Sequence, residues 1–522
     1  MKLSLLLLFA SVACQFDRPA DVRSPDARPV DANVPGLEIV PIPATWVRLD
    51  GETTISVVLS RDPAVAPASV HVSVETLAPG IVAEPLVIGP ESSQGELVVR
   101  ALSAQGAVAT QGLPLRVIAA SATGVADASV DLAIAGPAGS VDEQFGAAGL
   151  AALGVGDGGG MFRHANGLVV VGSDRLSHFD RSGRIDAAFA DGGTYTPIFS
   201  GIVGPARVFA ASLSTGAIIV VGNGNGESVG TPRDDIFLQR LTPSGLRDPT
   251  FSETRERLLE SFRVSFVSPG ENGAFFVGGI AWGDVGNSLV IRKFDVRGTL
   301  DQSFGTDGSI QLSSAAQYTL DAMIVLPDDR LLVAWTQNDE VLRVTRWTAS
   351  GALDLGFAEG GSFQLNAHVS TTPVFARAFG LGVDASGQPL IAGWFAPAAT
   401  FDFRPYLVRL TVDGAPDSSW DGDGTWSPPG LGVNAAASAT SLGDGSLLVA
   451  GATAPTAGGP LSAQLYHLSD DGVAIPDFGP EGTADLDFPF SPSGQAFVDS
   501  TTRGWFVGGT SAGRPAVVRL WY

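Results

Sequence analysis

The stretch Gly298–Gly308, GTLDQSFGTDG, carries the motif that decides the fold of this chain. Its pattern is a glycine, two residues, an aspartate, two residues, an aromatic residue, three residues and a second glycine. The pattern recurs between residues 139 and 482, and its aromatic position is filled by Phe145, Phe189, Phe251, Phe304, Phe357, Trp420 and Phe478. Seven copies of one pattern indicate a repeat protein.

All seven copies keep the first glycine, whereas Ile475 replaces the aspartate in the last copy and Arg255 replaces the second glycine in the third. Glycine permits the positive φ that tight turns need, and an aspartate accepts bonds from N–H groups two or three residues on. We expect the aromatic side chain to be a buried plug between neighbouring repeats. The motif is therefore interpreted as a structural turn.

A second pattern follows the same period: short apolar strands end at Gly172, Gly222, Gly279, Trp335, Gly393, Gly451 and Gly509. Repeats of about 50–60 residues with three or four strands and no helix predict a seven-bladed β-propeller over residues 139–522, since a small sheet buries its faces only against its neighbours. We expect Val517–Tyr522 to lie against residues 139–155 and close the ring. The strand after each motif is expected to be the innermost.

The motif copies DQSFGTDG (Asp301–Gly308) and DEQFGAAG (Asp142–Gly149), with LLVAG (Leu447–Gly451), resemble the delta-60 repeat family of bacterial surface and secreted proteins. The resemblance covers residues 139–522. It implies a propeller at or outside the cell surface and transfers no catalytic residue.

Residues 37–135 contain about seven short stretches of alternating apolar and polar residues, separated by Gly/Pro turns. This pattern is typical of an immunoglobulin-like β-sandwich. The segment resembles the Ig-like modules that serve as spacers in bacterial surface proteins. We interpret it as a stalk, with a dedicated binding module as the alternative.

Residues 1–14 read as an export signal, with Lys2 before the apolar run Leu3–Ala10 and small residues before Cys14. This end resembles a bacterial lipobox, which implies lipid attachment at Cys14. Gln15 after the cysteine resembles sorting to the outer membrane. The alternative is an ordinary cleavage site with an incidental cysteine. The Pro- and Asp-rich residues 15–36 are expected to be a disordered tether.

The net charge of −23 argues against nucleic-acid partners and against direct binding to anionic membranes. The expected partner is a protein or glycan at the cell surface, and the expected contact with the membrane is an N-terminal lipid anchor alone. The predicted location is the outer membrane, facing the periplasm or the surface. We expect a monomer with no cofactor.

The search for catalytic chemistry finds no G-x-S-x-G elbow. No two histidines have metal-ligand spacing among His71, His164, His178, His368 and His467. Asp421 and Asp423 superficially resemble a calcium loop, but they fall inside the sixth turn motif, so a turn is favoured. We therefore predict no catalytic residue and no metal site.

Variable loops on a rigid ring are the expected place for function. The low-ranked candidate ligand-binding residues are Trp394, Phe401, Phe403, Arg404 and Tyr406, which gather aromatic side chains and a cation in one connection. The alternative is that these side chains pack onto the adjacent blade.

The favoured function is a cell-surface lipoprotein acting as a non-catalytic binding or scaffold module. The alternative is a propeller enzyme, a lyase or glycan hydrolase, with its site at the central tunnel. The carboxylates expected on innermost strands are Glu260, Asp485 and Asp487. Catalysis needs several titratable groups that converge at one place, and three scattered carboxylates are few.

Overall fold

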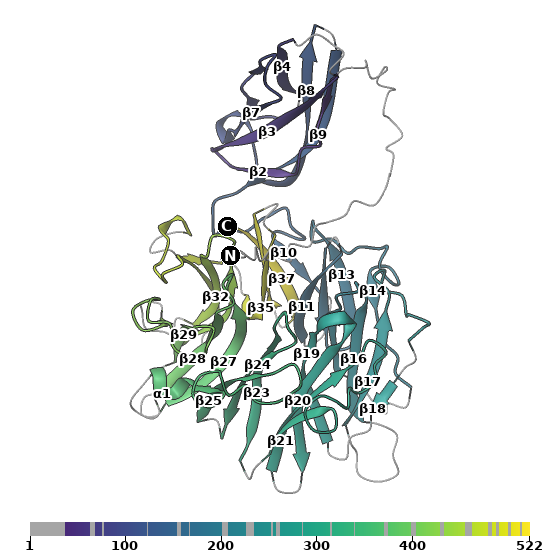
Figure 1. Ribbon diagram of the computed structural model, residues 1–522, viewed down its shortest axis with the longest axis vertical. Helices are drawn as coiled ribbons and strands as arrows, with labels where there is room; N and C mark the ends of the chain where they lie inside the picture. Colours follow the sequence, from purple (N-terminus) through teal and green to yellow (C-terminus); the bar gives the residue numbers. More distant parts are fainter. Residues whose placement is uncertain are drawn as a thin grey trace, which may run out of the picture.

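The computed structural model describes residues 37–522 apart from short gaps at 63–67, 76–77, 123, 154–157, 166, 201–206, 226–233, 252–253, 257–260, 284–285, 314–315, 339, 370–373, 398–402, 428–432, 455–461, 479–482, 487–489, 500–502 and 512–513. The predicted signal with Cys14 and the predicted tether lie outside the described residues. The described part is almost entirely β-structure (Figure 1).

Residues 37–135 form two facing sheets with a shared apolar core. One sheet has the order β1 (Leu37–Ile39), β3 (Glu52–Arg61), β7 (Gln94–Ala101) and β5 (Ile81–Ala83). The other has the order β2 (Thr45–Arg48), β9 (Gly124–Ala135), β8 (Thr110–Ser121), β4 (Val70–Glu75) and β6 (Leu86–Ile88). Inward residues of β3 such as Ile55 and Val57 alternate with exposed ones, as a sheet with one buried face requires.

The remaining chain forms seven four-stranded antiparallel sheets, numbered here as sheets 1 to 7. Sheet 1 contains β11 (Gly158–His164), β12 (Gly167–Gly172), β13 (Leu176–Asp180) and β14 (Thr194–Tyr195). Sheet 2 contains β15 (Arg207–Ser212), β16 (Ile218–Asn225), β17 (Asp234–Leu241) and β18 (Thr254–Glu256). Sheet 3 contains β19 (Ser261–Pro269), β20 (Phe275–Gly283), β21 (Gly286–Phe294) and β22 (Ser309–Ser313). Sheet 4 contains β23 (Tyr318–Val325), β24 (Leu331–Gln337), β25 (Val341–Trp347) and β26 (Ser362–Gln364).

Three sheets complete the set. Sheet 5 contains β27 (Val374–Val383), β28 (Pro389–Pro397), β29 (Arg404–Arg409) and β30 (Thr425–Trp426). Sheet 6 contains β31 (Val433–Ser441), β32 (Leu447–Ala454), β33 (Ser462–Leu468) and β34 (Thr483–Asp485). Sheet 7 contains β35 (Ser491–Asp499), β36 (Gly504–Ser511), β37 (Arg514–Trp521) and β10 (Leu150–Ala152). The short helix α1 (Leu365–Val369) and the 3₁₀ turns Ser103–Gln105, Glu271–Gly273 and Pro476–Phe478 are the other regular elements of the described residues.

The first strands of the seven sheets form a closed ring. Each contacts the next in the series β11, β15, β19, β23, β27, β31 and β35, and β35 contacts β11. The chain is a β-propeller, in which these first strands are innermost. The expectation that the strand after each motif is innermost is wrong: that strand pairs only with the outer edge of the third strand, as β14 does with β13. The motif turn reverses the direction of the chain beside the third strand. Because the inner edge of the third strand is already paired with the second strand, the strand after the motif pairs with the outer edge.

The ring closes within sheet 7, where the two ends of the repeat region meet. Strand β10 pairs antiparallel with β37, with Ala151 opposite Val517, and Val141 forms a further bridge with Leu520. The expectation that Val517–Tyr522 lies against residues 139–155 is confirmed. Since β10 precedes sheet 1 in the chain but is the outermost strand of sheet 7, closure leaves no open gap between these two sheets.

The aromatic position of the motif is buried in all seven copies, with no more than 5% of any side chain exposed. The first glycine of each motif has a positive φ and lies against the aromatic ring of the preceding copy. A Cβ on Gly245 would come within 2.6 Å of the Phe189 ring. Gly139 lies in the same way against Phe478, at the ring closure. The aromatic residues are therefore plugs between neighbouring sheets, as expected.

The motif aspartates form the expected Asx turns. The N–H of the residue two positions later donates to the Oδ1 of all six: Asp142, Asp186, Asp248, Asp301, Asp354 and Asp417. The N···O distances run from 2.8 Å at Asp248 to 3.2 Å at Asp142. The motif aspartate, which is the most regular polar residue of the repeat, thus stabilises the motif turn.

The ring has two different faces. The turn face carries the hairpins between first and second strands and the motif turns. The loop face carries the connections from second to third strands and from each fourth strand to the next sheet. The sandwich joins the turn face, next to the end of β37 (Figure 1). There the Arg503 guanidinium lies 4.5 Å from the Trp46 ring of β2 and 4.3 Å from the Tyr522 ring.

Candidate binding surfaces and the central cavity

A basic residue eight positions before five of the six motif aspartates was missed by the sequence reasoning, although its spacing is visible in the sequence; the exception is Asp142. Examples are Arg240 with Asp248 at 2.9 Å and Arg346 with Asp354 at 2.6 Å. The Arg346 guanidinium also lies 4.8 Å from the Phe357 ring. In the second copy, His178 takes this place beside Asp186. The basic residue thus connects the turn, the aromatic plug and the third strand.

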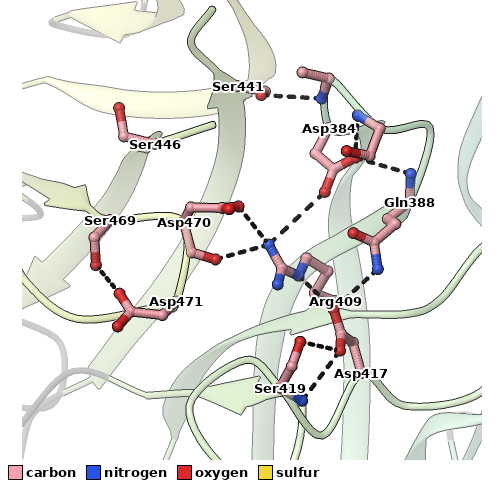
Figure 2. A network of polar contacts seen from close by, with 12 residues as sticks. Asp384, Gln388, Arg409, Asp417, Ser419, Ser441, Ser446, Ser469, Asp470 and Asp471 are labelled. Atoms are coloured by element: carbon pink, nitrogen blue, oxygen red, sulfur yellow. Dashed lines mark hydrogen bonds and ion pairs between the residues drawn. The ribbon is translucent and has the colours of Figure 1, made fainter. Parts of the chain in front are cut away.

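Arg409 shows how far this network extends (Figure 2). Its guanidinium lies 2.9 Å from Asp417, 3.0 Å from Asp470 of the next sheet and 3.8 Å from Asp384. Burial opposes ionisation of Asp417, but hydrogen bonds from Ser419 and Gln388 and the Arg409 charge outweigh it, so the pKa of Asp417 is lowered. This carboxylate cluster is organised around an arginine and holds adjacent sheets together.

No set of three or more His, Cys, Asp or Glu side chains in the described part of the chain is arranged to hold a metal ion. Asp421 has a φ of 47°, and Asp423 accepts a 2.8 Å bond from the Thr425 N–H, so both belong to a turn. Burial and then the neighbouring Asp423 raise the pKa of Asp421. The backbone geometry therefore agrees with the prediction that Asp421 and Asp423 belong to a turn.

Four of the five histidines have local partners that account for them. His164 bonds the Pro243 carbonyl at 2.7 Å, and His178 lies 3.0 Å from Asp186. His368 bonds Thr425 at 2.7 Å, and His467 bonds Ser446 at 3.2 Å. The fifth, His71, is exposed on β4 of the sandwich. These histidines therefore do not converge on one site.

The candidate residues of sheet 5 divide into two groups. Trp394 and Phe403 are half-buried and form an edge-to-face pair, with ring centroids 4.6 Å apart, beside the exposed Arg404 at the loop face. Tyr406 is fully buried, and its hydroxyl donates to the Arg377 carbonyl at 3.0 Å. The prediction of Tyr406 as a ligand contact is wrong, because its ring packs inside the propeller. Phe401 lies outside the described residues.

A second aromatic–cation pair on the loop face was missed. Trp282, at the end of β20, is 42% exposed, and the Arg263 guanidinium lies 5.9 Å from its ring. Both belong to sheet 3, whereas Trp394 and Phe403 belong to sheet 5. A large exposed aromatic next to an arginine is typical of a protein or glycan contact. Each side chain is unremarkable in the sequence, and only the strand pairing brings them together.

The centre of the ring encloses a cavity of about 770 Å³. Its walls come from β11, β15, β19, β23 and β27, with Gln495 of β35. Apolar side chains predominate, including Phe209, Phe266 and Phe379. Arg163 and Arg207 are the titratable residues among the described residues of the wall. A cavity of this size is within the usual range for small-molecule sites.

The two arginines lie at opposite ends of the cavity. Arg163 is next to the β11–β12 hairpin on the turn face; its guanidinium donates to the Val498 carbonyl and lies 5.0 Å from the Phe497 ring. Arg207 begins β15 at the loop face, where it pairs with Asn223. Arg207 is exposed, and the described residues offer it no ion-pair partner. The loop-face end therefore carries the more available positive charge.

The carboxylates expected near the tunnel do not gather there in the described part of the chain. Asp485 is an exposed residue of β34, the outermost strand of sheet 6. Glu260 and Asp487 lie outside the described residues. The reversal of inner and outer strands explains the displacement of Asp485.

Comparison with known proteins gives fold neighbours only at low similarity. No family model and no curated protein sequence matches the chain, so the delta-60 resemblance stays a prediction. In addition, no helix of the described residues is long and apolar enough to span a membrane.

Among solved structures, the β-propeller domain of the Trilobed protease from Pyrococcus furiosus is 10% identical, with 60% of this chain and 79% of that chain covered and a TM-score of 0.32. A DUF4623 family protein from Bacteroides eggerthii is 10% identical, with coverage of 89% and 88% and a TM-score of 0.31. An endo-arabinase from Bacteroides thetaiotaomicron is 12% identical, with coverage of 62% and 98% and a TM-score of 0.26. Because these scores are low, the description of the fold rests on the strand pairing.

Proposed function

We propose that this chain is an exported, non-catalytic binding or scaffold protein whose seven sheets act as the blades of a propeller. In this proposal, the sandwich is an Ig-like spacer, and Cys14 carries the lipid that holds the protein at the outer membrane. The partner is a protein or glycan that contacts the loop face.

One observation carries the proposal: the sandwich lies on one face of the ring, and two aromatic pairs that include or adjoin an arginine lie on the other. The Arg503–Trp46 contact is on the turn face. Trp282 with Arg263, and Trp394 with Phe403, are on the loop face. A spacer attached to the turn face directs the loop face away from the anchor. Rigid rings that present variable loops on one side are suited to recognition.

The test measures binding of the full chain to an array of bacterial polysaccharides, with Trp394→Ala and Trp282→Ala variants beside it. Binding by the native chain that falls at least tenfold in either variant supports the proposal. Val412→Ala and Val473→Ala are matched controls, because both remove exposed apolar side chains from motif turns on the turn face.

A protein partner is tested in a second arm. A photo-crosslinking residue placed at position 404 is compared with one at position 412 on intact cells. Specific adducts at position 404 alone favour a protein partner. Equal labelling at both positions, together with no glycan binding, overturns the loop-face proposal.

The alternative is a lyase or glycan hydrolase at the central tunnel. Glycoside hydrolysis uses a pair of carboxyl groups that flank the scissile bond. The described cavity wall instead offers Arg163 and Arg207 among apolar side chains. This lining favours binding over acid–base chemistry. Release of reducing ends or of unsaturated uronates from the arrayed polysaccharides would reverse that preference.

A further inference from the structure

Arg207 and Arg263 occupy equivalent positions on neighbouring innermost strands. In sheet 2, Val208 pairs with Gly222, and in sheet 3, Val264 pairs with Gly279, the matching glycine of the repeat. Each arginine immediately precedes its valine. Since β15 and β19 contact each other, both arginines lie at the loop-face end of the tunnel, on adjacent strands.

A third arginine, Arg377, occupies the same register position in sheet 5. This arginine has an ion-pair partner. Arg377 precedes Ala378, which pairs with Gly393, and its guanidinium lies 3.0 Å from Asp321. Within the described residues, no carboxylate takes that role for Arg207 or Arg263, and both side chains are exposed. Two positive charges without a carboxylate partner among the described residues at one end of the tunnel give that end a positive potential, which attracts an anion.

The cavity whose wall includes Arg207 is lined mainly by apolar side chains, and several of these are phenylalanines. Strand β27 has a β-bulge between Ala378 and Gly380, so Phe379 is the extra residue. A bulge redirects a side chain out of the sheet pattern, and Phe379 lines the cavity while 43% exposed. Phe209 and Phe266 line the same space from sheets 2 and 3.

We propose that the central cavity is a binding site for a small organic anion with an aromatic or aliphatic body. Its carboxylate or sulfonate group pairs with Arg207 of the cavity wall at the loop-face mouth, where Arg263 on the adjacent strand adds positive charge, and its apolar body contacts Phe209 and Phe379. The cavity of about 770 Å³ is large enough for a two- or three-ring molecule. The positive mouth of a chain with net charge −23 is the complement that an anion requires. The cavity lies inside the ring, whereas the partner proposed above contacts the loop face, and Arg263 is the residue common to the two proposals.

Two fluorescent probes of nearly the same shape test the proposal on the full chain. 8-Anilinonaphthalene-1-sulfonate is anionic, and N-phenyl-1-naphthylamine is its neutral counterpart. We expect one saturable site for the sulfonate, with affinity at least about tenfold above that of the neutral probe, as one charge-assisted contact provides. Equal affinities for the two probes, or sulfonate binding that does not saturate at one site, overturn the proposal.

Two variants then assign the roles. Arg207→Gln should weaken sulfonate binding about tenfold and leave the neutral probe unchanged, whereas Phe379→Ser should weaken both. Arg207→Lys should restore part of the sulfonate affinity. Arg297→Gln is the control, because it removes an exposed arginine from a turn-face motif. Unchanged sulfonate affinity in Arg207→Gln, or an equal loss in Arg297→Gln, contradicts the assignment. Melting temperatures near that of the native chain show that each variant is folded.

Discussion

Arg519 and Asp142, 377 positions apart in the sequence, form a buried ion pair that joins the two ends of the ring. The arginines of this position pair with the aspartate eight positions later, as Arg240 does with Asp248. For Arg519 that role is taken by the aspartate of the first motif. Burial lowers the pKa of Arg519, and the Asp142 charge opposes this. The ring closure therefore reproduces the contact that connects the strands within each sheet.

Replacement of Asp142 by Asn is expected to destabilise the propeller by about 3–5 kcal/mol, because it removes the carboxylate that forms the ion pair with the buried Arg519 guanidinium. Urea unfolding followed by tryptophan fluorescence measures the loss. Asp328→Asn removes the exposed partner of Arg330 and should cost less than about 1 kcal/mol. Similar losses in the two variants would mean that the closure pair is no more important than a surface pair.

Phe304→Ala should reduce the free energy of unfolding by about 3–5 kcal/mol. Its ring is buried against Phe276, at a centroid distance of 5.5 Å, and against Gly351 of the next motif. Truncation leaves a cavity between two sheets. Leu355→Ala, at a residue 71% exposed in the neighbouring motif, is the control and should change stability by less than about 0.5 kcal/mol. A loss below about 1 kcal/mol in Phe304→Ala would contradict the plug role.

His164 should make the propeller less stable as the pH falls. Burial lowers the pKa of His164; the Pro243 carbonyl opposes this, and the His178 charge adds to it. The unfolded chain then binds a proton at a higher pH than the folded chain does. The contribution of His164 is complete above the unfolded value near 6.5 and is lost as the pH falls towards the lower folded value.

The measurement is the melting temperature at pH 7.5 and pH 5.5, in the native chain and in His164→Gln. The variant should show a smaller difference between the two pH values, whatever its absolute stability. His71→Gln, at the exposed histidine of β4, is the control. A pH difference that stays the same in His164→Gln would assign the acid sensitivity to other groups.

Cys14→Ala should move the full chain from the membrane fraction to the soluble fraction, because an acyl-chain anchor is lost. Fractionation with a carbonate wash and immunoblotting measures the distribution. Ser24→Ala, within the tether, should stay with the membranes. Membrane association of Cys14→Ala equal to that of the native chain would count against lipidation.

The sequence predicted the parts of the fold that repeat. Glycine, aspartate and aromatic residues recur at fixed spacing, and each has one physical role, so Gly245, Asp248 and Phe251 could be assigned to a turn and a plug. The spacing of the repeat does not indicate which edge of each sheet faces the central axis of the ring. The order of strands within each sheet was therefore inverted, and Asp485 was expected at the tunnel when it lies on the rim.

The candidate site was predicted less well, because exposure at a strand end depends on pairing. Arg404 and Tyr406 are two residues apart, but Arg404 is exposed at the start of β29 while Tyr406 lies inside the core. The Arg263–Trp282 pair requires knowledge that β19 and β20 are neighbours. Phe379 reaches the cavity because of a bulge, which its sequence does not mark.

The pairing of β10 with β37 also sets the order of events during biosynthesis. Residues 150–152 leave the ribosome early in the repeat region, but their partner strand consists of residues 514–521. The seam therefore stays unpaired until more than 350 further residues have been made. The ring cannot lock before its last strand has been made, so the topology makes ring closure a late step in the assembly of the propeller.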